Sequence, residues 1–365
     1  MKMEENMVAG IIGATGYAGV ELVRLLLSHP HVDKLVLSSV SFEGQNIQDV
    51  YPSLLGRLFG KTDGILRTAD EVKTQADVIF TALPNGLAEE YADFCLKNGK
   101  KLIDLSADFR FNKDEATFKK WYKADWKFPE THAQSVYGLP EWNRDKIRQA
   151  KIVGNPGCYV TASTLALIPA LKEKIVKTDS IIVDAKSGVT GAGRSATMTN
   201  QFCECGESFS AYKVGAHRHQ PEIAKNCSVV AGKNVGIIFT PHLVPMSRGI
   251  FATIYAPLSD EFCEKIKGKS AEEASAFVRS IFEETYKDEP FVRVLKAGQA
   301  ATTKTVRYSN FCDIQVYVVN DGKTLEITSV IDNMGKGSSS QAVQNMNLMF
   351  GFNETEAINF PSPAI

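Results

Sequence analysis

Apolar and polar residues near the start of the chain are ordered as a strand, a glycine turn and a helix. Residues 7–12 form a short apolar run that leads into glycine, and residues 20–27 follow with apolar positions at helical spacing. Further elements are predicted as strands at 35–39, 77–84 and 101–105 and as a helix at 88–97. Strands that alternate with helices predict an α/β fold, here a Rossmann-type doubly wound parallel sheet that binds ligands at the carboxyl ends of its strands.

The pattern changes at about residue 152, from where strands outnumber helices. The predicted strands of this part are 180–185, 229–230, 235–240, 250–256, 291–295 and 313–319. Among them only residues 271–286 have the spacing of a long amphipathic helix. We therefore expect a second α+β domain built on a mostly antiparallel sheet.

The last predicted helix covers residues 341–350 and follows three serines at 338–340 that are well placed to cap it. We expect this helix to return to the first domain. The predicted domains are therefore residues 1–150 plus 331–365, and residues 151–330.

The composition is that of an ordinary globular protein. The 365 residues include 41 basic and 42 acidic side chains, a formal net charge of -1. This balance gives no electrostatic reason to expect binding to nucleic acid or to an anionic membrane. Seven scattered cysteines indicate a reducing compartment, and the polar first residues do not resemble a signal peptide. No apolar run approaches the ~18 residues of a membrane span, so we expect a cytoplasmic protein.

The glycine turn has the form GATGYAG at residues 13–19. Gly13 would allow a tight turn out of the strand, and Gly16 would let the backbone approach a pyrophosphate. Gly19 would let the helix pack close to the sheet, while the helix N-terminus receives the phosphate charge. This variant of the dinucleotide fingerprint predicts a cofactor site, and the alternative is a tight structural turn.

The end of the second strand favours NADP over NAD. An NAD site usually has Asp or Glu there to bind the ribose hydroxyls, but Ser38 and Ser39 occupy this place. Hydroxyl groups without a carboxylate fit a 2′-phosphate better. No arginine follows immediately, and Glu43 is close enough to leave NAD as an alternative.

A candidate nucleophile follows a Pro-Gly turn in the segment GNPGCY, residues 154–159. Cys158 stands just before a helical run at 160–167. A thiol at a helix N-terminus faces unpaired N–H groups and the positive end of the helix dipole, which favour the reactive thiolate. The alternative is that Cys158 is a small buried hydrophobic residue.

A histidine pair is the candidate acid or base. In extended chain His217 and His219 share one face, so one of them could approach Cys158 while Glu222 orients it. The residues alone do not choose between the two, and both could instead be surface histidines. A zinc site with Cys203 and Cys205 is a further alternative, but the spacing does not match structural zinc patterns, and we expect no metal.

Three arginines stand in segments suited to an anionic substrate. Arg194 ends a glycine-rich loop that begins near Gly188, and the alternative for this loop is a mobile hairpin. Arg110 follows a strand end, where a structural Asp–Arg pair is the alternative. Arg248 lies beside strand residues, where it could bind a substrate anion.

Together these segments resemble the N-acetyl-γ-glutamyl-phosphate reductases of the semialdehyde dehydrogenase family. The matching segments are GATGYAG (13–19), SADFR (106–110), YGLPE (137–141), NPGCY (155–159), SGVTGAGR (187–194), HRHQPEI (217–223) and PMSRG (245–249). The terminal helix is also similar, so the resemblance covers essentially the whole chain. The cysteine and histidine segments are specific in combination.

The resemblance implies NADPH as cofactor, a Rossmann domain for it, and a second domain that carries catalysis and mediates homo-oligomerisation, as dimer or tetramer. It implies reduction of N-acetyl-γ-glutamyl phosphate through a thioester on Cys158, with His217 as acid/base, in arginine biosynthesis. The candidate catalytic residues are Cys158, His217, His219 and Glu222. The candidate cofactor-binding residues are Gly13, Thr15, Gly16, Tyr17, Gly19, Ser38, Ser39 and Gly188. The candidate substrate-binding residues are Arg110, Arg194 and Arg248.

Two alternatives are retained. Relatives with the same chemistry reduce aspartyl phosphate or a carrier-bound aminoadipyl phosphate, and one sequence does not reveal the substrate pocket. Redox sensors that bind NADP without catalysis also begin with Gly-Ala-Thr-Gly, although a sensor would not need Cys158 or the histidine segment.

Overall fold

The computed structural model describes residues 7–363, which divide into two compact units. The first contains residues up to Pro156 together with Ser338–Phe360, and the second contains Gly157–Gly337 and the residues from Pro361 onward. The last segment is attached through the Ser362 hydroxyl, which donates to the Lys304 carbonyl at 2.9 Å. The sequence-based boundaries, 150/151 and 330/331, differ from these. Residues 152–154 pair as a strand within the first unit, and the turn from Asp332 to Gly337 is hydrogen-bonded within the second.

The first unit is the predicted parallel sheet with helices. Its strands lie in the order β3-β2-β1-β4-β5-β7-β6, and all neighbours are parallel. The strands are β1 (Met7–Ile12), β2 (Val32–Ser38), β3 (Leu66–Arg67), β4 (Val78–Thr81), β5 (Lys101–Asp104), β6 (Val136–Tyr137) and β7 (Ile152–Gly154). The central strands are almost wholly buried, as expected for a parallel sheet covered on both faces. The Rossmann-type prediction is confirmed.

Eight α-helices belong to the described part of this unit. They are α1 (Tyr17–Leu27), α2 (Ile47–Val50), α3 (Ala69–Gln75), α4 (Glu89–Lys97), α5 (Glu115–Tyr122), α6 (Pro129–Gln134), α7 (Pro140–Gln149) and α13 (Ser340–Phe350). The last of these returns to the first unit, as predicted: the Lys101 ammonium contacts the Met349 carbonyl, and His29 bonds Asn347 at 2.8 Å.

The expected serine cap of α13 is wrong. Residue Ser339 has helical backbone angles and its hydroxyl donates to the Ala18 carbonyl at 2.9 Å instead of capping the helix. The reason is that a π-helical turn, Gly335–Ser339, runs directly into α13, so no extended cap residue precedes it.

The second unit contains a mixed sheet in the order β12-β13-β14-β11-β8-β10-β9. Its strands are β8 (Ile181–Ser187), β9 (Ser210–Ala211), β10 (Ile237–Leu243), β11 (Ile250–Pro257), β12 (Val292–Val294), β13 (Cys312–Val319) and β14 (Thr324–Ile331). The pairings β8–β11, β11–β14, β13–β14 and β9–β10 are antiparallel, whereas β8–β10 and β12–β13 are parallel. The prediction of a mostly antiparallel second sheet is therefore confirmed.

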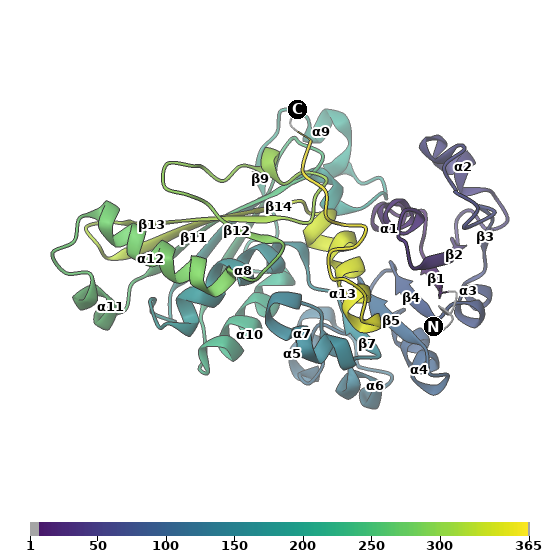
Figure 1. The fold of residues 1–365 in the computed structure, drawn as a ribbon, viewed down its shortest axis with the longest axis horizontal. Coiled ribbons are helices and arrows are strands. Elements are labelled where there is room, and N and C mark those ends of the chain that lie inside the picture. Colours follow the sequence, from purple (N-terminus) through teal and green to yellow (C-terminus); the bar gives the residue numbers. More distant parts are fainter. Residues whose placement is uncertain (1–6, 364–365) are drawn as a thin grey trace. The chain divides into compact units, whose positions relative to one another are not determined.

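Helices cover one face of this sheet. The helices of the unit are α8 (Cys158–Lys172), α9 (Phe202–Cys205), α10 (His219–Ala231), α11 (Asp260–Lys265) and α12 (Ala271–Tyr286). In Figure 1, α8 and α12 lie against the same face, where Ser329 of β14 donates to the Ala162 carbonyl of α8 at 2.9 Å. No helix among residues 7–363 is long and apolar enough to span a bilayer.

The strand expected at 229–230 is wrong, because these residues lie inside α10. The β-branched Val229 and Val230 suggested a strand. Burial of Ile223 and Cys227, one helical turn apart, where α10 packs on α8 favours the helix instead.

Candidate active site

The glycine loop between β1 and α1 depends on two glycines for its shape. Gly13 has φ +92°, and a Cβ there would lie 2.4 Å from the Ala82 carbonyl oxygen. A Cβ on Gly19 would lie 2.1 Å from the Gly13 carbonyl oxygen. By contrast, a Cβ on Gly16, the residue before α1, would meet only that same oxygen, at 3.5 Å. The turn and the close helix packing are as predicted, and the start of α1 is open to a ligand.

The serines at the end of β2 lie against this loop. The amides of Gly13 and Ala14 donate to the Ser38 carbonyl at 3.1 and 2.8 Å. The hydroxyls of Thr15 and Ser39 are 2.7 Å apart and both residues are buried. The end of β2 therefore carries hydroxyl groups and a serine where NAD-binding folds usually have a carboxylate, which fits NADP.

Three further side chains belong to elements that adjoin the glycine loop or the end of β2. Tyr17, at the start of α1, is partly exposed, and Glu43 is exposed in the loop after β2. Arg67 was missed in the sequence because it is far from Ser38 along the chain, yet it is the register partner of Ser38 on β3. Its guanidinium pairs with Asp63 at 2.6 Å and holds the pKa of that carboxyl at about 2.

Cys158 is the first residue of α8, directly after the extended residue Gly157 (φ −66°, ψ 146°). The predicted helix start is confirmed. Cys158 is partly exposed, whereas burial raises the pKa of the thiols of Cys95 and Cys227 to about 12. Those two cysteines match the alternative of small buried hydrophobic residues, and Cys158 does not.

Two side chains of α10 meet the residue that precedes Cys158. The Gly157 amide donates to Glu222 Oε1 at 3.1 Å, and Glu222 is fully buried. A Cβ on Gly157 would lie 2.5 Å from His219 Nε2, so the imidazole packs on the Gly157 backbone. The structure therefore brings Cys158, His219 and Glu222 together at one turn.

The histidine pair does not lie in an extended strand, so that expectation is wrong. His219 is the first residue of α10, and Arg218 before it already has helical backbone angles. His217 precedes the helix, and its Nδ1 accepts the His219 amide at 3.1 Å. Burial, together with the charges of Lys213 and Arg218, lowers the pKa of His217 to about 4. His217 is thus a neutral residue just before α10, while His219 is the imidazole that packs on Gly157, the residue before Cys158.

Aromatic side chains surround the two imidazoles. The ring of His217 lies 5.8 Å from Tyr159, 5.5 Å from Tyr212 and 5.3 Å from Phe239. The Tyr212 hydroxyl donates to that of Tyr159 at 3.2 Å, and Tyr159 donates to the His242 carbonyl at 3.1 Å. Burial raises the pKa of Tyr212 to about 12, so both phenols stay neutral near pH 7.

The three candidate arginines have different surroundings. Arg110 is buried and donates to the carbonyls of Leu105 and Asn155 at 2.9 and 2.8 Å, through which it braces the chain just before the Pro-Gly turn. Arg248 donates from Nε to buried Asp332. Arg194 is exposed in the glycine-rich loop.

Gly188 is held against the segment that contains Arg248. Its amide donates to the Gly249 carbonyl at 2.9 Å, and a Cβ would lie 2.7 Å from the Ser247 carbonyl oxygen. Thr190 continues this contact by donating to the same oxygen at 2.6 Å. The loop is thus fixed at its start rather than mobile there.

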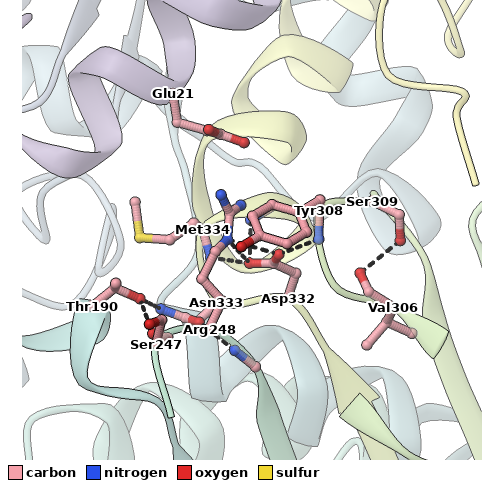
Figure 2. A network of polar contacts seen from close by, with 12 residues as sticks. Glu21, Thr190, Ser247, Arg248, Val306, Tyr308, Ser309, Asp332, Asn333 and Met334 are labelled. Carbon is pink, nitrogen blue, oxygen red and sulfur yellow. Dashed lines mark hydrogen bonds and ion pairs between the residues drawn. The ribbon is translucent and has the colours of Figure 1, made fainter. Parts of the chain in front are cut away.

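Figure 2 shows a polar network that the sequence did not reveal, centred on Asp332 and Asn333 after β14. Asn333 accepts from the Gly249 amide at 2.7 Å and donates to the Thr190 hydroxyl at 2.9 Å. Residues 324–331 are not among the predicted strands, so nothing marked the two residues that follow them. The available signal of a strand was Leu325 and Ile327 at alternate positions, followed by the apolar pair Val330 and Ile331.

No cluster of three or more His, Cys, Asp or Glu side chains suited to a metal ion occurs among residues 7–363. Cys203 and Cys205, which suggested the zinc alternative, lie in the short helix α9, where Cys203 is exposed.

Each of the two units matches a known protein family. Residues 8–150 match the semialdehyde dehydrogenase NAD binding domain, and residues 158–333 match the semialdehyde dehydrogenase dimerisation domain. The chain therefore belongs to the semialdehyde dehydrogenase family. The fold agrees: aspartate semialdehyde dehydrogenase II from Vibrio cholerae superposes with a TM-score of 0.70 at 18% identity, covering 95% of this chain and 99% of that one.

Curated relatives narrow the family. N-acetyl-gamma-glutamyl-phosphate reductase from Clostridium beijerinckii is 49% identical over 97% of this chain and 98% of its own length. The enzymes of the same name from Brachyspira hyodysenteriae and Moorella thermoacetica are 44% and 47% identical, with the same coverage of both chains. Within its family, the chain belongs with the N-acetyl-gamma-glutamyl-phosphate reductases.

Proposed function

We propose that this chain is an NADPH-dependent oxidoreductase that reduces N-acetyl-γ-glutamyl phosphate to N-acetylglutamate 5-semialdehyde and phosphate, a step of arginine biosynthesis. Near-full-length identity of 49% to a reductase of this name supports the substrate. The observation that supports the chemistry is the position of Cys158 at the start of α8, with Glu222 and His219 both on Gly157.

The first unit would hold the dinucleotide. The open start of α1 at Gly16 suits the pyrophosphate, and Ser39, paired with Thr15, suits the phosphorylated ribose. When bound, NADPH supplies the hydride for the reduction. Among solved structures of the same fold, aspartate semialdehyde dehydrogenase from Candida albicans was determined with NADP.

Cys158 would act as the nucleophile. The positive end of the α8 dipole stabilises its thiolate, which attacks the acyl carbon. A C–S bond forms while the bond from carbon to the phosphate oxygen breaks, and phosphate leaves. The thioester would accept the hydride to give the alkoxide of a thiohemiacetal on Cys158, and cleavage of its C–S bond would release the aldehyde and restore the thiolate.

His219 fits the proton carrier better than His217. Its imidazole packs on the residue next to Cys158, where it can accept the thiol proton and pass it to the leaving phosphate. His217 has a pKa of about 4 and accepts the His219 amide, so its role is to orient the start of α10. Glu222 would fix the Gly157 backbone, and Arg194 would hold an anionic group of the substrate.

The chain would act as a cytoplasmic homo-oligomer. Its second unit matches a domain described as a dimerisation domain. The face of the second sheet that α8 and α12 leave uncovered carries partly exposed Ile182, Ile238 and Tyr255. Apolar side chains on a sheet face are suited to burial against a second copy.

The test is phosphate-dependent reduction of NADP⁺ by the purified protein given N-acetylglutamate 5-semialdehyde. Aspartate semialdehyde and NAD⁺ serve as parallel controls. Activity only with the acetylated substrate and NADP⁺ supports the proposal. Activity with aspartate semialdehyde would keep the chemistry and change the substrate, and tight NADP⁺ binding without turnover of either aldehyde would indicate a sensor.

A further inference from the structure

We propose that Gly337 is a positioning residue that sets the orientation of the Cys158 thiol, and that the turn closed by Asp332 and Arg248 holds Gly337 in place. The inference rests on the proposed role of Cys158 as nucleophile. All residues concerned belong to the second unit.

The space around Gly337 is too small for a side chain. A Cβ there would lie 2.8 Å from Cys158 Cβ and 3.2 Å from both the Asp332 carbonyl oxygen and Ile331 Cδ1. Real Cβ atoms do not approach other atoms to 2.8 Å, so with a larger residue at this position either that residue or Cys158 must shift. The Gly337 backbone therefore forms a wall against the nucleophile's side chain.

The main chain just before Cys158 is closely packed as well. His219 lies against Gly157, the residue before Cys158, where a Cβ would be 2.5 Å from Nε2. The main chain before Cys158 and the Cβ that carries its sulfur are therefore both closely packed, and this packing limits how far the residue can shift. A fixed position keeps the sulfur at the helix N-terminus, where its charge is stabilised.

Asp332 determines where Gly337 lies. This fully buried residue accepts the Gly337 amide on its main-chain oxygen at 2.9 Å. Its carboxylate accepts the amides of Met334 at 2.8 Å, Gly335 at 3.1 Å and Tyr308 at 2.5 Å (Figure 2). The turn from Asp332 to Gly337 is thus bonded at its start, middle and end.

Arg248 completes the turn. Its Nε lies 3.0 and 2.9 Å from the two carboxylate oxygens of Asp332, and its guanidinium carbon lies 4.6 Å from the centre of the Tyr308 ring. The Arg248 side chain is only 11% exposed. A buried carboxylate needs a charge partner and hydrogen bonds, and Arg248 provides both. Arg248 therefore acts on the reaction through Asp332 and Gly337.

The first test is Gly337→Ala, read by alkylation of Cys158 with iodoacetamide and quantified on the Cys158 peptide by mass spectrometry. No substrate is needed, so this readout does not depend on the proposed function. We expect alkylation at pH 7 to fall about tenfold and its pH profile to move upward by one unit, because the displaced thiolate loses the helix N-terminus. In turnover we expect kcat to fall about 100-fold, with KM and the NADPH Kd unchanged.

Gly268→Ala is the matched control. Gly268 has φ +81° and no atom within 4 Å of its Cβ position, so alanine strains the backbone without touching Cys158. Its alkylation and kcat should equal those of the wild type. Wild-type alkylation and kcat in Gly337→Ala would overturn the proposal.

Asp332→Asn provides a second variant if Gly337→Ala does not fold. It keeps the size of the side chain and removes the charge that pairs with Arg248, so we expect a smaller loss of Cys158 alkylation in the same direction. Unchanged alkylation would refute the part assigned to Asp332. Failure of the proposed function is separate, because it would show as continued turnover by Cys158→Ser.

Discussion

The start of α1 and the start of α8 are the same local structure used for two purposes. Each follows a strand, and each has a glycine as the extended residue before the helix. They differ in how closely they are packed: a Cβ on Gly16 would meet one oxygen at 3.5 Å, but on Gly157 it would meet the His219 ring at 2.5 Å. An open helix start can receive a ligand phosphate, whereas an enclosed one can hold a reactive side chain in a single orientation.

The largest effect is expected from Cys158→Ser, which removes the thiol at the start of α8 and leaves the start of α1 unchanged. We expect kcat to fall at least about 1,000-fold, because the hydroxyl is a far weaker nucleophile than a thiolate. The NADPH Kd, measured by fluorescence titration, should be unchanged. Cys263→Ser changes another partly exposed cysteine of the same unit and should leave both constants unaltered. Turnover by Cys158→Ser at the wild-type rate would refute the thioester chemistry.

Gly19→Ala should disturb the glycine loop at the start of α1 and leave the start of α8 unchanged. Its Cβ would lie 2.1 Å from the Gly13 oxygen, so α1 must move away from the loop. Overpacking of this kind costs about 1–3 kcal/mol, and we expect the NADPH Kd to rise by about 10- to 100-fold. Alkylation of Cys158 should be unaffected.

The control for this variant is Gly99→Ala, which has φ +70° and no atom near its Cβ position. It introduces backbone strain in the same unit without touching the glycine loop. An equal loss of NADPH affinity in both variants would mean that general destabilisation, rather than loop geometry, explains the result.

Ser39→Asp tests which dinucleotide the open start receives. A carboxylate at this place would repel the 2′-phosphate and bind ribose hydroxyls, so the ratio of the NADP⁺ Kd to the NAD⁺ Kd should rise on the order of tenfold, or about 1.4 kcal/mol. Ser39→Ala is the matched variant, because it removes the bond to Thr15 without adding charge. A ratio that stays constant in Ser39→Asp would place the 2′-phosphate elsewhere.

The smallest effect concerns the protonation of His217, whose ring lies 5.8 Å from that of Tyr159 in the first turn of α8. Its pKa of about 4 lies below the ordinary value of 6.5, so the unfolded chain binds a proton on His217 between these pH values and the folded chain does not. The contribution of His217 to the free energy of unfolding should therefore be lost as the pH falls from 6.5 toward 4. The imidazole NMR signals of His217, assigned with His217→Gln, should stay constant from pH 8 to pH 5.5. A midpoint near 6.5 would show that His217 is not shielded from water.

The sequence allowed much of the fold to be predicted because the signals were local. The apolar runs of β1, β4 and β5 and the glycines of the first turn follow from periodicity and backbone sterics. Helix α10 could not be predicted in this way. Its polar residues obscured the buried pair Ile223 and Cys227, and packing on α8 decided its conformation.

The candidate site could be predicted from the sequence where its signals were local. Cys158 and Gly157 form a local signal, and Glu222 was expected to act through a histidine; in the structure it accepts the Gly157 amide. Arg67 escaped notice because only the pairing of β3 with β2 places it beside Ser38. Asp332 and Gly337 lacked any motif, since their roles arise from residues far away in the chain.

By itself, the sequence determined the two strand–turn–helix segments and the thiol at the start of α8. Positive φ angles, helix dipoles and apolar periodicity act over a few residues, so they can be read from the order of amino acids. Only the tertiary structure decided which histidine lies beside Cys158, which carboxylate receives Arg248 and why residue 337 has no side chain. Those outcomes depend on close packing and on hydrogen bonds of buried polar groups, which join residues more than 60 positions apart.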